Sequence, residues 1–416
     1  MPDLFWPGDE RAGALMSDWA LLAAMETVEH AWLEALVEHK IAPAEAQTEI
    51  WGLLSEDDLA ALADRAEAGG NPVIGLVQLL RERLSPEAAR WVHRGLTSQD
   101  VLDTALMICL RDVLDRLDDE LRGQVESLCG LVSEHRSTPM VGRTLTQHAV
   151  PITFGLKAAS WLTGLLDAAE ALAGLRSRLR VQLGGAAGTL AASTELARLR
   201  GLPEPTQVSW RLVESVASAL GLAPAVPWHT SRSVVTATGD ALVGCIDAYG
   251  RIAADVATLS RPEIAELAEG SGGGSSTMPQ KNNPVLSVLI RRAALTGPPL
   301  ASTLHLAAAT NVDERPDGSW HAEWATLRDL ARRTAIAASQ ASELITGLVV
   351  DEDRMAANLA AAAGIEAEQQ AMADLVPVER SEEYLGAARP NKEYLGATEL
   401  IIDRVLARAD QRPGVV

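Results

Sequence analysis

Long amphipathic stretches dominate the sequence, because apolar residues recur at intervals of three and four through most of the chain. One stretch extends from Thr97 to about His135 and begins with TSQD, which is typical of a helix N-terminus. Comparable stretches cover residues 152–181, 232–267, 284–309 and 321–348. Tyrosine and phenylalanine are scarce, whereas alanine and leucine abound. The sequence therefore predicts an all-α protein built around long helices.

The length of 416 residues, about two to three times that of a typical domain, predicts more than one domain. We expect an N-terminal helical domain over residues 1–96, a central long-helix bundle over 97–349 and a shortened C-terminal helical region over 350–416. The C-terminal region holds a near-repeat, EYLGAA at 383–388 and EYLGAT at 393–398, too short for a solenoid. Helices this long cannot all bury wide apolar faces within one subunit, so we expect lateral association with other subunits in a homo-oligomer.

The charge balance limits the classes of partner. Acidic residues number 56 against 36 basic ones, which gives a formal net charge of -20. Such a charge argues against binding to nucleic acid or to an anionic membrane surface. Any anion that binds must therefore meet a local arginine or lysine.

The sequence gives no indication of disulfides, membrane segments, metals or cofactors. The three cysteines, Cys109, Cys129 and Cys245, have no CxxC spacing, so neither a disulfide framework nor a thiolate metal site is expected, and a reducing cytoplasm fits. We expect no signal peptide and no membrane span. No HxxH or HExxH pair suggests a metal, and GGAAG at 184–188 lacks the spacing of a dinucleotide loop. We therefore expect no metal and no cofactor.

The most unusual segment is GSGGGSSTMPQKNNP at residues 270–284, between two predicted long helices. Its glycines favour a mobile segment that can approach a ligand closely, and two prolines bracket a stiff part. Ser275 and Ser276 supply hydroxyls, and Lys281 supplies a cation. Composition alone also fits a plain flexible linker. The combination with TMPQKNNP instead indicates a lid over an anionic substrate whose proton is removed by a serine.

Residues 274–284 resemble the GSSxMPxKxNP signature of the fumarase/aspartase superfamily at every fixed position. HRGLTSQDVLDTA at 93–105 and GRTLTQHAVPITFG at 142–155 are similar to two upstream motifs of that family. Three further segments resemble 3-carboxy-cis,cis-muconate cycloisomerases in particular, with adenylosuccinate lyases as the next relatives: QLGGAAGTLAAS (182–193), WHTSR (228–232) and DERPDGSWHAEW (313–324).

The resemblance implies a fold in which long helices join four subunits through a central bundle, with each active site built from three subunits. It also implies anti addition or elimination next to a carboxylate of a small di- or tricarboxylate. Ser275 matches the family's base, which takes the proton alpha to a carboxylate, and Lys281 and Asn283 match positions that stabilise the resulting negative charge. A serine can act as base only where amides and cations stabilise its alkoxide.

Other polar residues of these motifs are expected to bind the substrate. The arginines can form bidentate pairs with carboxylates, and a helix N-terminus offers free amides to an anion. We expect Asp100 to be a helix cap instead. The predicted substrate-binding residues are Arg94, Thr97, Ser98, Arg143, Thr144, Gln147, Ser276, Met278, Arg232, Arg315 and His93.

Two departures from the relatives bear on the substrate. Adenylosuccinate lyases have a catalytic histidine where this chain has Leu145, which argues against that activity and leaves the general acid open among His93, His148, His229 and His321. Cycloisomerase-like chains usually read MPHKRNP where this one reads MPQKNNP, so its loop carries less positive charge.

Three functions therefore stay open. The first is a 3-carboxy-cis,cis-muconate cycloisomerase-like enzyme. The second is a lyase that eliminates an amine or nitrite from a substituted succinate to give fumarate. The third is a non-catalytic helical assembly protein. This is possible because relatives carry a small helical domain after the position of Leu359, and the corresponding region of this chain is shorter.

Overall fold

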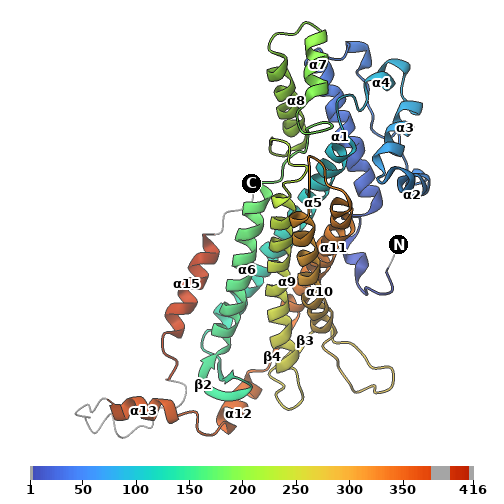
Figure 1. Cartoon of the computed structure of the whole chain (residues 1–416). Helices are drawn as coiled ribbons and strands as arrows, with labels where there is room; N and C mark the ends of the chain where they lie inside the picture. Colours follow the sequence, from blue (N-terminus) through green and yellow to red (C-terminus); the bar gives the residue numbers. More distant parts are fainter. Residues whose placement is uncertain (1–2, 376–393, 412–416) are drawn as a thin grey trace. The chain divides into compact units, whose positions relative to one another are not determined.

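A computed structural model describes residues 3–375 and 394–411. Helices predominate, and each of the five predicted long helices is present (Figure 1). Their bounds are α5 (Ser98–Glu134), α6 (Phe154–Arg176), α9 (Ser233–Leu259), α10 (Val285–Ala309) and α11 (Gly318–Thr346). The predicted all-α class is confirmed. The first copy of the YLG near-repeat and the start of the second lie outside the described residues.

Helix α9 ends earlier than the sequence pattern predicts, at Leu259 instead of about 267. Pro262 follows within three residues, and a proline disfavours helical backbone in the residue before it. The apolar residues after it belong to strand β3 (Leu267–Glu269), which pairs antiparallel with β4 (Leu348–Val350).

The chain divides into two compact units, and the divisions fall within long helices. Unit 1 consists of residues 1–117, 172–243 and 297–336, and unit 2 of residues 118–171, 244–296 and 337–416. The elements wholly in unit 1 are η1 (Asp9–Ala12), α1 (Asp18–Glu38), η2 (Ala44–Ala46), α2 (Asp58–Gly69), α3 (Val73–Arg83), α4 (Pro86–Trp91), α7 (Ala191–Leu199) and α8 (Pro205–Leu220).

Local sequence explains where the helices of unit 1 begin. Ser17 precedes α1, and its hydroxyl accepts a hydrogen bond from the Ala20 backbone N at 3.1 Å. Ser85 caps α4 in the same way, and Pro86 occupies the first turn, where no amide hydrogen is needed. Helix α1 is buried along most of its length, and Trp32 is fully enclosed. It therefore forms the centre of the N-terminal core.

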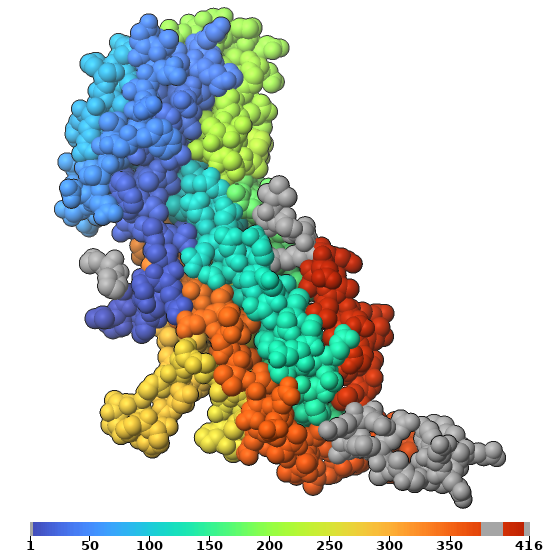
Figure 2. All heavy atoms as spheres, turned by 180° about the vertical axis from the view of Figure 1, so that it is seen from behind, coloured from blue at the N-terminus to red at the C-terminus, as the bar shows by residue number. Residues whose placement is uncertain are grey.

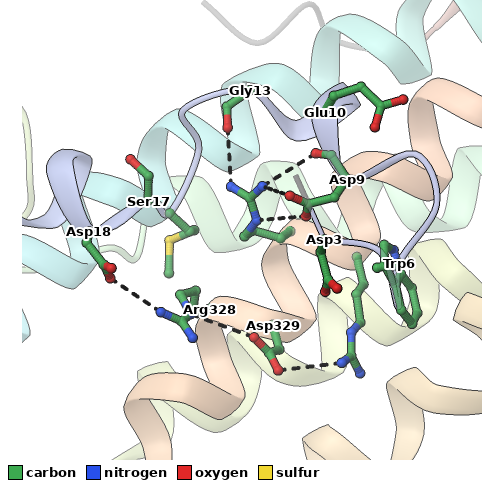
Figure 3. A pocket seen from close by; sticks show the side chains of 12 residues that line it. Asp3, Trp6, Asp9, Glu10, Gly13, Ser17, Asp18, Arg328 and Asp329 are labelled. Carbon is green, nitrogen blue, oxygen red and sulfur yellow. Dashed lines mark hydrogen bonds and ion pairs between the residues drawn. The ribbon is translucent and has the colours of Figure 1, made fainter. Parts of the chain in front are cut away.

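Ion pairs tie the N-terminal segment to α11 within unit 1. Arg332 donates hydrogen bonds to both carboxylate oxygens of Asp9, and to the Leu15 carbonyl at 2.7 Å. A cavity of about 580 Å³ lies beside these contacts, and its arginines point toward carboxylates of the same wall (Figure 3). Each of these arginines is paired with a carboxylate, so these contacts hold the segment against α11.

Unit 2 contains the β1–β2 hairpin, the β3–β4 pair, α12 (Glu352–Ala361), α13 (Ala367–Leu375) and α15 (Thr398–Asp410). Its parts of α6 and α9 pack through small residues, with Gly164 against Ala248, and Trp161 Nε1 donates to Asp255 at 2.8 Å. On α5, Gln124 donates to the Ala338 carbonyl of α11 at 2.9 Å.

A β-hairpin joins α5 to α6 in unit 2. Strands β1 (Pro139–Thr144) and β2 (Gln147–Thr153) pair antiparallel, with an irregularity between Val141 and Arg143. A β-carbon at Gly142 would lie 2.5 Å from the Val150 carbonyl oxygen, so only glycine fits there. Within the described residues, no helix is long and apolar enough to cross a membrane.

Candidate active site

The first motif forms a tight turn ahead of α5 in unit 1. His93 has φ 64°, a left-handed conformation that residues other than glycine rarely adopt. Trp32 Nε1 donates to the Arg94 carbonyl at 2.8 Å, and Arg81 of α3 donates to the Val92 carbonyl at 3.2 Å. Side chains from two helices therefore hold the turn in place.

Asp100 anchors the start of α5, as predicted for a cap. Its Oδ2 accepts from the Thr97 backbone N at 3.0 Å, which is half of a capping box. The same carboxylate accepts from the backbone N atoms of Gly184 and Gly185 at 3.0 and 2.9 Å, and lies 3.1 Å from His229 Nε2. The glycine segment and His229 therefore support the helix end, and His229 is buried.

Several predicted substrate ligands gather at this helix start. Arg315 Nη1 donates to the Thr97 hydroxyl. His93 and Ser98 line one cavity of about 470 Å³. Arg94 is exposed, and its Nε donates to the Arg90 carbonyl at 2.6 Å. This part of unit 1 thus offers hydroxyls and cations beside a helix N-terminus, a combination suited to a carboxylate.

Arg232 occupies a different environment from the one predicted. Its side chain is fully buried, and it donates to Asp103 at 2.6 and 3.0 Å and to Glu323. Burial alone would lower the pKa of Arg232, but the two carboxylates outweigh burial and raise it above its usual value. Because the whole side chain is enclosed and two buried carboxylates engage the guanidinium, we leave Arg232 out of the substrate site and assign it to the core.

The second motif lies on the hairpin of unit 2. Arg143 donates to both oxygens of the buried Glu266, at 2.9 and 2.7 Å. Thr144 and Gln147 are exposed at the tip, where Leu145 is 95% exposed with φ 47°. The tip thus presents Thr144 and Gln147 beside Leu145, and Arg143 keeps an orientation set by Glu266.

The base of the 270–284 loop is fixed by a backbone pair. Gly273 and Asn283 exchange two N–H···O hydrogen bonds, both 2.8 Å. Glu269 is buried and accepts from the backbone N atoms of Leu286 and Ser287 at 3.0 and 2.7 Å, which caps α10. A β-carbon on Gly273 would lie 2.1 Å from a Val285 methyl group. At the base of the loop, Gly273 therefore permits close packing.

The tip of this loop brings two amides to the predicted base. Ser275 Oγ accepts hydrogen bonds from the backbone N atoms of Met278 at 3.1 Å and Thr277 at 3.4 Å. Asn283 Nδ2 donates to the Gly274 carbonyl at 3.2 Å, so this side chain shapes the loop. Ser276, Met278 and Lys281 are exposed on the tip. Two donors on one hydroxyl oxygen favour its alkoxide, the form that abstracts a proton.

The hairpin and the loop lie on opposite sides of unit 2 (Figure 1). In the space-filling view the loop, drawn in golden yellow, stands out from the surface of its unit (Figure 2). Within unit 2, one chain therefore does not bring the hairpin and the loop together. A second copy of the chain is needed if both segments belong to one site.

Within the described part of the chain, no group of three or more histidine, cysteine, aspartate or glutamate side chains is arranged to hold a metal ion. Cys109 and Cys245 are buried, and burial raises the pKa of each thiol to about 12. Such thiols are poor nucleophiles.

Comparison with known proteins identifies the family. A family model described as "Lyase" matches residues 24–296. The chain belongs to the fumarase/aspartase superfamily. This assignment makes it a lyase or cycloisomerase of that superfamily, as its motifs predict. A nitrosuccinate lyase of Streptomyces davaonensis is 44% identical to this chain over 406 residues. The match covers 95% of this chain and 83% of the relative.

This chain is also similar to cycloisomerases. A 3-carboxy-cis,cis-muconate cycloisomerase of Bradyrhizobium diazoefficiens is 42% identical over 315 residues, which cover 74% of the chain and 67% of the relative. Among solved structures, a 3-carboxy-cis,cis-muconate lactonizing enzyme from Pseudomonas putida has a TM-score of 0.83 at 31% identity, covering 96% of this chain and 97% of that one. The predicted resemblance to cycloisomerases is confirmed.

Sequence reasoning missed the residues that hold the motifs. Trp32, Arg81 and Glu266 belong to none of the quoted motifs, yet each contacts a motif backbone or side chain. A buried tryptophan or glutamate gives no local signal of its partner, because the contact joins positions far apart in the sequence. Only an arginine without an obvious local partner, such as Arg143, hints that a distant carboxylate is needed.

Proposed function

We propose that this chain catalyses anti addition or β-elimination next to a carboxylate, with Ser275 as the base in one direction and the acid in the other. The observation that supports this role is the pair of backbone amides directed at Ser275 Oγ, 3.1 and 3.4 Å away. In the elimination, the Ser275 alkoxide takes the proton alpha to a carboxylate, and the leaving group departs with the electron pair of its bond to the neighbouring carbon.

The negative charge formed on the substrate needs preorganised donors. Lys281 supplies a cation on the same loop, and Asn283 holds the loop backbone through Gly274. One well-placed donor to such an anion contributes about 3 kcal/mol to transition-state stabilisation. Ser276 and Met278 extend the loop surface toward the substrate. We propose that Arg94, Arg143, Thr97, Ser98, Thr144, Gln147, Arg315 and His93 bind its carboxylates.

We propose a homotetramer with active sites shared between subunits. The positions of the hairpin and the loop on opposite sides of unit 2 support this arrangement (Figure 1). Exposed apolar residues on α10 support it too, because Val288 is 55% and Leu295 76% exposed, and they lie seven residues apart on one helical face. Light scattering tests the assembly, and a monomer at micromolar concentration would contradict it. The free thiols fit our proposal of a cytoplasmic location.

The first candidate substrate is a 3-carboxy-cis,cis-muconate. In that reaction a carboxylate of the muconate adds across an alkene, and protonation alpha to another carboxylate completes a lactone. The similarity to cycloisomerases over most of their length supports this candidate.

The second candidate is a nitro- or amino-substituted succinate that loses nitrite or an amine to give fumarate. Two observations favour it. The similarity to a nitrosuccinate lyase extends over 95% of the chain. The loop also carries neutral Gln280 and Asn282 beside its single lysine, which suits a substrate with two carboxylates better than one with three.

A two-substrate assay separates these candidates. The purified enzyme is given nitrosuccinate with detection of fumarate and nitrite, and in parallel 3-carboxy-cis,cis-muconate with detection of the loss of its ultraviolet absorbance. If either substrate is turned over and the turnover is lost in Ser275→Ala, the proposed role of Ser275 as base is supported. The substrate with the larger kcat/KM is then the better candidate. An intact oligomer that turns over neither substrate would favour the non-catalytic assembly protein.

A further inference from the structure

Behind the wall of the cavity beside the start of α5 lies a buried carboxylate that none of the motifs includes. This cavity of about 470 Å³ is lined by α3 residues, among them Gln78, Arg81 and Glu82, and by His93 and Ser98. Behind His93 lies Glu29 of α1, with its Oε1 2.5 Å from His93 Nδ1. The Glu29 side chain is fully buried, whereas His93 keeps 17% of its side chain exposed.

The chemistry of this contact determines which ring nitrogen carries a proton. An ionised carboxylate can only accept hydrogen bonds, so Nδ1 of His93 must be the donor. The lone pair of the neutral ring then lies on His93 Nε2. It has no hydrogen-bond partner within residues 3–375 and 394–411, and His93 forms part of the cavity wall.

Two further features set this contact apart from an ordinary ion pair. Glu29 Oε2 is buried and has no hydrogen-bond partner within the described residues, so the hydrogen bond of this carboxylate is directed at His93. His93 also has φ 64°, and such backbone strain is found where side-chain direction matters. Leaving a carboxylate buried with one partner is unfavourable unless it serves a purpose.

We propose that Glu29 is a positioning residue that fixes the tautomer and direction of His93, so that Nε2 faces the substrate. This inference rests on the proposed function. His93 Nε2 and the Ser98 hydroxyl then hold one end of the substrate, a carboxylate or the leaving group. When neutral, Nε2 accepts a hydrogen bond from that end, and when protonated it donates one. Arg81, Glu82 and Arg94 are the charged groups around the pair.

The direct test measures the reactivity of His93 without using turnover. Diethyl pyrocarbonate acylates a ring nitrogen that has a free lone pair, and peptide mass spectrometry gives the rate at His93 across a range of pH. In Glu29→Gln the side-chain amide can donate to Nδ1, which moves the proton to Nε2. We expect the acylation of His93 to slow several-fold. An unchanged rate at every pH would overturn the proposal.

Glu26→Gln is the matched control. Glu26 lies one turn earlier on α1 and is also buried, but it accepts hydrogen bonds from the backbone of residues 52–54. Burial raises the pKa of the Glu26 carboxyl. We expect this variant to leave the acylation rate of His93 unchanged. An equal slowing in both variants would indicate a general effect of losing a buried charge on α1 and would contradict the proposal.

Kinetics supply a second readout for whichever substrate is turned over. We expect Glu29→Gln to lower kcat/KM by about 10- to 100-fold and to change its pH profile, as loss of a residue that orients a histidine does. In a His93→Gln background the same substitution should have no further effect. If Glu29→Gln instead lowers kcat/KM by the same factor with and without His93, the role of Glu29 is purely structural and the proposal is overturned. If neither substrate is turned over, the proposed function fails, and the acylation rates still decide the role of Glu29.

Discussion

Gly270 and Gly347 pack so closely that a β-carbon on Gly270 would lie 2.4 Å from the Gly347 carbonyl oxygen. This contact lies at the base of the 270–284 loop, next to the β3–β4 pair. We expect Gly270→Ala to lower the free energy of unfolding by about 1–3 kcal/mol, because the added methyl group must displace backbone. Denaturant unfolding measures the change.

Gly274→Ala is the control for that prediction. Gly274 lies four residues further along the same loop, and a β-carbon there meets nothing within 4 Å. We expect this variant to have the same denaturant midpoint of unfolding as the wild type. Equal destabilisation of the two variants would mean that the loop glycines matter for their backbone freedom and not for close packing.

The buried cluster around Arg232 predicts a large effect on stability. Arg232→Met leaves the carboxylates of Asp103 and Glu323 buried without their cation. Breaking such a pair from one side lowers the free energy of unfolding by about 3–5 kcal/mol. Thermal unfolding of Arg232→Met measures this loss, and Arg198→Met, which removes an exposed pair with Glu195, should leave the midpoint unchanged. A similar midpoint for both variants would contradict the assignment of Arg232 to the core.

A pH-dependent contribution is expected from the pair that joins α2 to the end of α3. The hydrogen bond from Arg83 lowers the pKa of Asp58 to about 2 from its model-compound value of 3.8. The pair therefore stabilises the fold fully above about pH 4 and loses this effect as the pH falls toward 2. Asp58→Asn should lower stability by no more than about 1 kcal/mol at pH 7. Urea unfolding should show the difference shrinking at low pH, and a difference independent of pH would contradict the pairing.

Sharing of the active site predicts that two inactive variants can restore each other. Gln147→Glu places a negative charge against the substrate, and Ser275→Ala removes the base, so each oligomer alone should be inactive. If the two positions meet only across subunits, mixed and reassembled oligomers should regain roughly a quarter of wild-type activity, because half of the subunits supply each intact residue. Initial rates after reassembly measure this.

The control for this experiment mixes Ser275→Ala with Lys281→Met. Both changes lie on one loop, so no mixed site receives an intact loop. We expect these mixtures to stay inactive. Recovery here, or none with the Gln147→Glu partner, would contradict sites shared in the way proposed.

The sequence predicted the long helices well, because their burial pattern repeats over many turns. The start of α5 differs from its predicted position by a single residue. The hairpin around Arg143 was not predicted, since its strands contain Gly142 and Pro151 and turn through Leu145 and Thr146 at positive φ. Such a hairpin is stabilised by tertiary contacts and not by local propensity.

The candidate site was predictable only in part, for a related reason. The motifs single out residues that we propose contact the substrate, such as Ser275. They do not reveal that Arg232 lies in the core, because its partners Asp103 and Glu323 are 129 and 91 residues away in the chain. Nor do they reveal Glu29, which becomes meaningful only once α1 packs behind His93.

The most direct measurement is the turnover of Ser275→Ala beside that of Thr277→Ala. The latter keeps the backbone amide that donates to position 275 and changes only an exposed side chain. We predict that Ser275→Ala retains the wild-type melting temperature and oligomeric state while kcat falls by about 1000-fold or more, and that Thr277→Ala stays near the wild-type rate. A Ser275→Ala enzyme that turns over its substrate at a near-normal rate would contradict the proposed mechanism.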